Sequence, residues 1–89
     1  MKPAKFEQST HRFGPPPGLD ETQVMTVDAY VGEVRGGSLC GAQVCVTAWK
    51  PDTEELAALV RGEPLFLSFI GSIPPHYPSV DFHSASNPA

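Results

Sequence analysis

The chain has 89 residues, enough for one small domain but close to the size at which a single core stabilises a fold only marginally. Its net charge of −4 comes from ten acidic and six basic residues, and the basic residues are scattered. Extended DNA or RNA needs a clustered basic surface, so neither is an expected partner. No apolar run is long enough to cross a bilayer and the N-terminus does not resemble a signal peptide, so we expect an intracellular protein with no membrane partner.

The two ends of the chain differ in composition from its middle. Residues 1–18 are poor in large apolar side chains and contain Pro15-Pro16-Pro17-Gly18, which is typical of a flexible, proline-rich N-terminal arm. Residues 85–89 are small and polar, which indicates a disordered tail. One domain over residues 19–84 remains. Because so small a core is commonly completed by association, we expect a homo-oligomer.

Two strands are predicted in the first half of this domain. Residues 24–34 are rich in β-branched and aromatic side chains, and the glycines at 36 and 37 supply a turn signal. Along residues 39–49 the apolar Val44, Val46 and Ala48 alternate with other side chains, which is the period of a strand. The valines of residues 24–34 also fit one face of a helix, but the high valine content and Gly32 favour a strand.

A short helix is predicted over residues 52–61. Asp52 can accept a hydrogen bond from the backbone N–H of Glu55, and Glu55 can reach back to that of Asp52. Arg61 suits the negative end of the helix, and Gly62 favours the left-handed stop. The helix carries an apolar stripe that we expect to be buried: Leu56, Leu59 and Val60.

Two further strands are predicted after the helix. Residues 65–70 are apolar on both alternating faces, which suits a strand covered on both sides. Residues 71–78 form a proline-rich loop, and residues 79–83 are predicted as a last edge strand. The expected fold class is therefore α+β: a small antiparallel β-sheet of about four strands with one short helix, in the order ββαββ.

Cys40 and Cys45 are the only cysteines, too few for a disulfide framework. Two positions five apart on one strand would also point to opposite faces. Free cysteine is among the most buried residue types, so we expect both thiols to be free and buried.

Trp49 and its neighbours are the first candidates for ligand binding. A tryptophan at the end of a strand can stack a nucleobase; it can equally pack under the helix or in a subunit interface. Lys50 and Arg61 flank the helix and can neutralise a phosphate, or they can be ordinary surface charges. The position of Trp49 in core, interface or pocket stays open at this point.

The proline-rich segments supply the other candidates. Prolines restrict the backbone, so the loop can hold His76 and Tyr77 ready for a ligand. Arg12 lies in the N-terminal arm, which can dock across a neighbouring subunit, cap a pocket or stay flexible. His76 has no evident nucleophile or acid nearby in the sequence, and its spacing to Asp81 and His83 matches no common zinc pattern. With no phosphate-binding loop either, we expect no metal, no cofactor and no enzymatic activity.

Several motifs together resemble small accessory proteins encoded by tailed bacteriophages and prophages: Trp49-Lys50-Pro51, Glu54-Glu55-Leu56, Gly62, the apolar strand, and Gly71 before Pro74-Pro75. The segments 12–18 and 30–33 are similar too, so the resemblance spans most of the chain. The resemblance implies a viral origin, and a viral origin implies a location in the host bacterial cytoplasm. It does not imply an activity.

Small, acidic, non-enzymatic phage proteins often act by binding. The resemblance therefore favours a homo-oligomeric counter-defence protein that sequesters a small nucleotide immune signal, such as a cyclic nucleotide, in pockets between subunits. Trp49 and Tyr77 would stack the base, while Lys50, Arg61 and Arg12 would meet phosphate. The alternatives are an inhibitor that binds a host defence protein, a structural or assembly component of the virion, and a metal-dependent enzyme.

Overall fold

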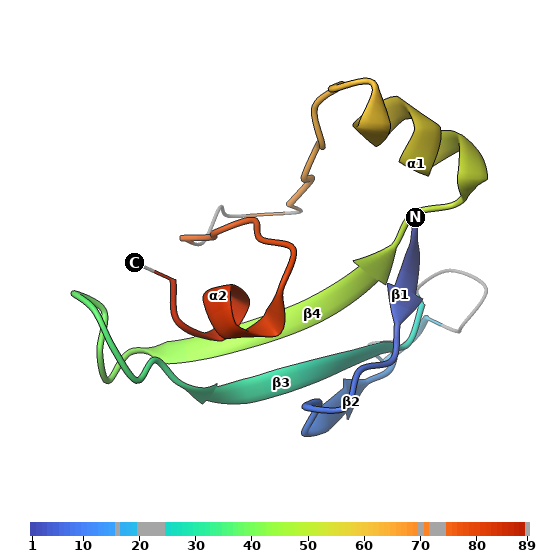
Figure 1. Ribbon diagram of the computed structural model, residues 1–89. Helices are drawn as coiled ribbons and strands as arrows, with labels where there is room; N and C mark the ends of the chain where they lie inside the picture. Colours follow the sequence, from blue (N-terminus) through green and yellow to red (C-terminus); the bar gives the residue numbers. More distant parts are fainter. Residues whose placement is uncertain (16, 20–24, 70, 72–74, 89) are drawn as a thin grey trace.

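The structure is a computed structural model that describes residues 1–15, 17–19, 25–69, 71 and 75–88 (Figure 1). Four strands form one antiparallel sheet in the order β1-β4-β3-β2, and two short helices follow them in the chain. The fold class is α+β, as predicted. The elements are β1 (Lys2–Ala4), β2 (His11–Phe13), β3 (Val27–Glu33), β4 (Gln43–Lys50), α1 (Thr53–Val60) and α2 (Phe82–Ser86).

The β3–β4 hairpin is the centre of the sheet and confirms the first predicted pair of strands. Ala29 lies opposite Thr47 and Glu33 opposite Gln43, so the described part of residues 24–34 is a strand rather than a helix. The connecting loop is closed by the N–H of Gly41, which donates to the carbonyl of Val34 at 2.8 Å. Gly41 has φ of +92°, a backbone conformation that glycine adopts without steric cost.

The expected N-terminal arm is wrong in one respect, because it supplies two of the four strands. β1 pairs with the end of β4, and β2 pairs with the start of β3. Both strands have three residues and lie at the edges of the sheet, where Pro3 is tolerated although it has no N–H to donate. They are held by backbone pairing and by the ion pair between Arg12 and Asp28. Neither feature produces the alternating apolar pattern by which a strand is recognised in a sequence.

The two strands predicted after the helix are also wrong, so the order is ββββαα instead of ββαββ. Residues 65–69 have no regular secondary structure, and Ile70 lies outside the described residues. Residues 79–83 lead into α2, because Asp81 caps that helix by accepting from the backbone N–H of Ser84 at 3.1 Å. The expected tail, residues 85–89, begins inside α2, where Ser86 is buried.

The helix prediction for residues 52–61 is confirmed in position. The backbone N–H of Glu55 donates to Asp52 Oδ1 at 2.8 Å, and the N–H of Asp52 donates to Glu55 Oε1 at 2.9 Å. This is the reciprocal capping arrangement that the residue types predict. Gly62 follows with φ of +87° and ends the helix.

One face of the sheet, here called the inner face, packs against α2. Tyr30 and Val46 lie opposite each other on this face, and the Tyr30 ring meets the Phe82 ring of α2 edge-on, with 5.1 Å between centroids. The Phe6 ring contacts Phe82 at 6.2 Å. Among the described residues the buried apolar side chains are Ala29, Val34, Val46 and Pro88. The core that the described residues form is therefore small.

We predict that Gly32→Ala lowers the free energy of unfolding by about 1–2 kcal/mol, a usual cost of overpacking. The Tyr30 ring lies over Gly32, where an added Cβ would be 2.5 Å from Cζ and closer still to the hydroxyl oxygen. The ring cannot move without weakening its contact with Phe82.

Urea unfolding of Gly32→Ala beside Gly36→Ala measures this effect. Gly36→Ala is the matched control, because a Cβ at Gly36 meets nothing within 4 Å. Equal unfolding free energies for the two variants would contradict the packing described for Tyr30.

Candidate functional site

Trp49 lies outside the core, near the end of β4. Its indole is 45% exposed, and Nε1 donates to Thr47 Oγ1 at 3.0 Å. Because side chains alternate along a strand, Trp49, Thr47 and Cys45 share the face of the sheet opposite α2, here called the outer face. Trp49 therefore does not pack in the core under the helix, which was one of the three alternatives. The other two, a contact in a subunit interface and a contact with a ligand, stay open.

Lys50 points to the other face of β4, so it does not share a surface with Trp49. It lies directly opposite Lys2 of β1 in the antiparallel register. Both side chains are exposed, and no ion pair of either lysine occurs within the described ranges. Like charges placed directly opposite each other repel, so the two lysines are a pair of like charges at this end of the sheet, although the carboxylates of Asp52, Glu54 and Glu55 follow Lys50 in the chain. Lys2 was not among the sequence-predicted residues, because its strand was not predicted.

Arg12 and Arg61 are each engaged by a neighbouring carboxylate. Arg12 Nε donates to Asp28 Oδ1 at 2.9 Å, and this hydrogen bond and the charge of Asp28 raise the pKa of Arg12. Arg61 Nη2 donates to Glu63 Oε2 at 2.6 Å. Both side chains of the Arg61–Glu63 pair are exposed, so that pair is weak and can be exchanged for another anion. In the Arg12–Asp28 pair only the arginine is exposed.

His76 and Tyr77 lie in the loop between α1 and α2. The ring of His76 contacts the ring of Phe69, with 4.7 Å between centroids, and Tyr77 is about half exposed. Three of the other predicted site residues make hydrogen bonds elsewhere: Trp49 with Thr47, Arg12 with Asp28 and Arg61 with Glu63. One chain therefore does not gather these six candidates around a single point.

Residues 53–69, here called the arm, expose six large apolar side chains. The stripe of α1 was expected to be buried, and this is wrong: no residue of α1 is buried, with Leu56 53% and Val60 79% exposed. Beyond the helix, Leu65, Leu67 and Phe69 are exposed, and Phe66 is 84% exposed. The physical reason is that α1 stands away from the sheet and from α2 in the described part of the chain (Figure 1). Its tie to the sheet is the ion pair of the Met1 α-amino group with Glu55 Oε2 at 2.6 Å.

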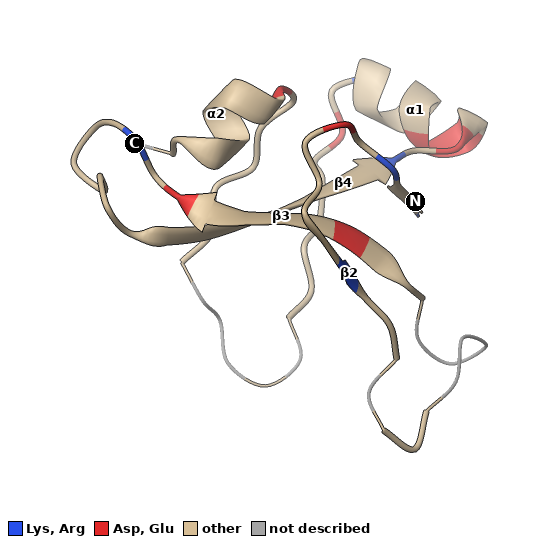
Figure 2. Ribbon diagram, turned by 90° about the horizontal axis from the view of Figure 1, so that it is seen from below, with Lys and Arg blue, Asp and Glu red and all other residues tan. Residues whose placement is uncertain are grey.

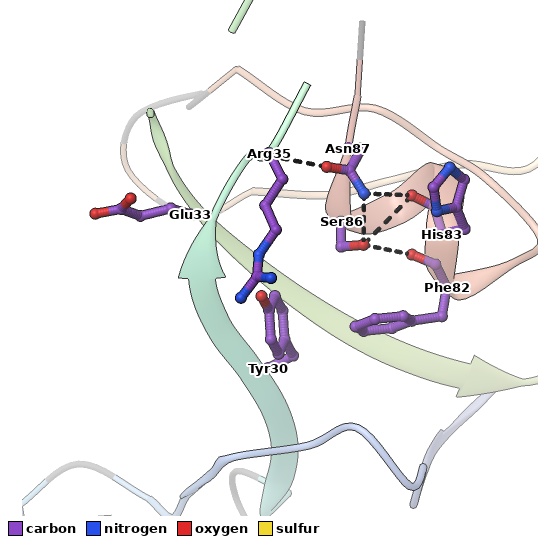
Figure 3. A pocket seen from close by; sticks show the side chains of 7 residues that line it. All are labelled: Tyr30, Glu33, Arg35, Phe82, His83, Ser86 and Asn87. Carbon is purple, nitrogen blue, oxygen red and sulfur yellow. Dashed lines mark hydrogen bonds between the residues drawn. The ribbon is translucent and has the colours of Figure 1, made fainter. Parts of the chain in front are cut away.

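A shallow cavity of about 270 Å³ lies between α2 and the end of β3 (Figure 3). Its wall includes Tyr30, Arg35, Phe82, His83 and Asn87, and the Arg35 side chain extends toward the Tyr30 hydroxyl (Figure 3). The backbone N–H of Arg35 donates to Asn87 Oδ1 at 2.9 Å, which joins the loop after β3 to the end of α2. The cavity was not anticipated because residues 79–83 were predicted as a strand.

Both cysteines are free, but the prediction that they are buried is wrong. Cys45 lies on the outer face of β4 and Cys40 in the loop before it, and both are exposed. Within the described part of the chain, no three His, Cys, Asp or Glu side chains are grouped closely enough to hold a metal ion. None of the described helices is long and apolar enough to cross a membrane. Acidic and basic residues are interspersed over the sheet and helices (Figure 2).

In comparisons with protein-family models, curated proteins and solved structures, the chain gave no match.

We predict that acidification loosens the start of α1 and its tie to Met1. The Asp52 N–H and the Met1 ammonium both bond the Glu55 carboxylate and lower its pKa from the ordinary 4.5. A depressed pKa means that the stabilising contribution is complete above the ordinary pKa and is lost as the pH falls through the folded-state pKa.

An NMR titration that follows the Glu55 carboxyl and the Asp52 amide measures this transition. Glu55→Gln should remove it, whereas Glu54→Gln, in the same helical turn, should leave it in place. A Glu55 midpoint at or above 4.5 would contradict the described contacts.

Proposed function

We propose that this chain is a non-enzymatic binding protein of phage origin that works as a homo-oligomer and sequesters a small nucleotide signal of the host defence. The observation that carries the proposal is the end of the sheet where β1 meets β4. There, Lys2 and Lys50 lie opposite each other without a carboxylate partner in the described residues, next to the exposed Trp49. Paired ammonium groups suit a phosphate, and an exposed indole suits a base.

The geometry restricts how a ligand can use these groups. Trp49 and Lys50 leave β4 in opposite directions, so a ligand that touches both must lie at the end of the strand and not on one face. A cyclic dinucleotide has two bases and two phosphates held apart by a ring, which is a shape that can reach around such an end. Full enclosure needs groups from outside the single chain, and this favours a pocket between subunits.

The assembly part of the proposal has separate support. Soluble monomers rarely expose contiguous apolar patches beyond a few hundred Å², and the arm presents six large apolar side chains in seventeen positions. The buried core of one chain is also small. Association covers the arm and adds the apolar burial that the single chain lacks.

The same exposed arm also supports the rival function, an inhibitor that binds a host defence protein. Val60 and Phe66 are the most exposed large apolar side chains of the arm and would be its anchors. The two functions differ in what the purified protein retains: a nucleotide in one case, and a host protein captured from the bacterial lysate in the other.

We predict that calorimetry against cyclic di- and trinucleotides detects one ligand at micromolar protein. Trp49→Ala should weaken it at least about fivefold, because base stacking contributes about 1–3 kcal/mol. The double variant Lys2→Gln/Lys50→Gln should weaken binding and flatten its salt dependence, because both changes remove phosphate partners.

Lys5→Gln is the matched control: it removes one exposed positive charge from the same N-terminal region but lies outside β1, and it should bind like the unmodified protein. Absence of binding to every cyclic nucleotide would refute sequestration, and a co-purifying host protein would then support the inhibitor.

A further inference from the structure

Two surfaces of this chain expose apolar side chains: the outer face of the sheet and the arm. The outer face of the sheet presents Phe13, Cys45 and Thr47, with Phe13 about half exposed and Cys45 and Thr47 exposed. Between them lie Val31, which is partly buried, and Ala29, which is fully buried. The arm, residues 53–69, presents a helix with an exposed apolar stripe and an exposed apolar segment. An amphipathic helix requires an apolar surface to be stable, and a sheet with one bare face requires a covering layer.

We propose that the arm of one copy packs on the outer face of the sheet of a second copy, which returns the same contact. This inference rests on the proposed function, which includes a homo-oligomer, and it specifies which surfaces of the chain form the interface. In the pair, each sheet has α2 on its inner face and the arm of the other copy on its outer face. The contact is reciprocal, as a two-fold symmetric dimer requires.

The size of the surfaces agrees with a stable dimer. The six apolar side chains of the arm expose on the order of 500 Å² together, judged from the usual areas of aliphatic and aromatic side chains. Two arms that each cover an equal area of sheet bury on the order of 2,000 Å², at the upper end of the standard interface. The arm residues that contribute are Leu56, Val60, Leu65, Phe66, Leu67 and Phe69.

The chemistry of the contact is also favourable. Residues 65–69 have no charged side chain, and the centre of the outer face, with Val31, Cys45 and Thr47, has none either. Burying residues 65–69 against this centre therefore removes no unpaired charge from water; the charged side chains of the arm lie in α1 and the turn after it. Within one chain the arm and the outer face are exposed at the same time, so the chain's own arm does not already cover its own sheet.

The pairing also supplies a missing part of the nucleotide site. Arg61 ends α1 and therefore belongs to the arm, while Trp49 lies on the outer face that the arm of the second copy covers. Arg61 of the second copy is thereby carried toward Trp49. Its exposed ion pair with Glu63 is weak enough to be exchanged for a phosphate.

The two cysteines allow this interface to be tested without any nucleotide. Both are exposed in one chain, but only Cys45 lies on the outer face; Cys40 is in the loop before β4. Alkylation by iodoacetamide, followed by mass spectrometry, gives the reaction rate of each thiol at low and high protein concentration. We expect the rate of Cys45 to fall at least tenfold as sedimentation shows a dimer forming, while the rate of Cys40 stays within twofold.

Phe66→Ser should abolish both the dimer and the protection of Cys45, and because Phe66 is exposed, circular dichroism should show an unchanged fold. Val80→Ser is the matched control, since Val80 is fully exposed but outside the arm, and it should behave like the parent chain. A dimer with a reactive Cys45, protection of Cys45 that Phe66→Ser does not remove, or a monomer at all concentrations would each overturn the interface. Failure of nucleotide binding alone would leave it intact.

Discussion

The antiparallel pairing of β3 with β4 determines which side chains lie on each face of the sheet, and the other elements pack accordingly. Its register places Tyr30 opposite Val46 on the face that α2 covers, and Val31 opposite Cys45 on the face that α2 does not cover. A slip of one residue would exchange the two faces and remove the contact of Tyr30 with Phe82 of α2. The same register places Trp49 and Lys50 on opposite sides of the strand, which restricts any shared ligand to the strand end.

The hairpin also explains the proposal of a dimer. It offers two faces, and among the described residues after β4 the helix α2 packs on the inner one. The other helix, α1, is stabilised locally by its capping box and by Met1, so it can form without packing on the chain's own sheet. An eight-residue helix held in this way stays marginal until an apolar surface meets its stripe, and in the proposed dimer the sheet of the second copy would provide that surface.

Local signals in the sequence predicted the parts of this fold that depend on neighbouring residues. The capping box of Asp52 and Glu55 and the alternation along β4 both use contacts within a few residues, and both are confirmed. Residues 65–69 misled the prediction because an apolar run fits a buried strand and an intermolecular contact equally well. β1 was missed because it depends on long-range backbone pairing with Lys50, Trp49 and Ala48, and Lys2 of the candidate site was missed with it.

Ligand binding and association reinforce each other if the base lies on Trp49 and the phosphate is shared by Lys50 and Arg61 of the second copy. A ligand that binds only the assembled form stabilises that form in proportion to the logarithm of its concentration. The repulsion between Lys2 and Lys50, which opposes closure of β1 onto β4, is relieved by the same phosphate. A scarce anionic signal would thus promote the assembly that encloses it, which is the behaviour that sequestration by a small protein requires.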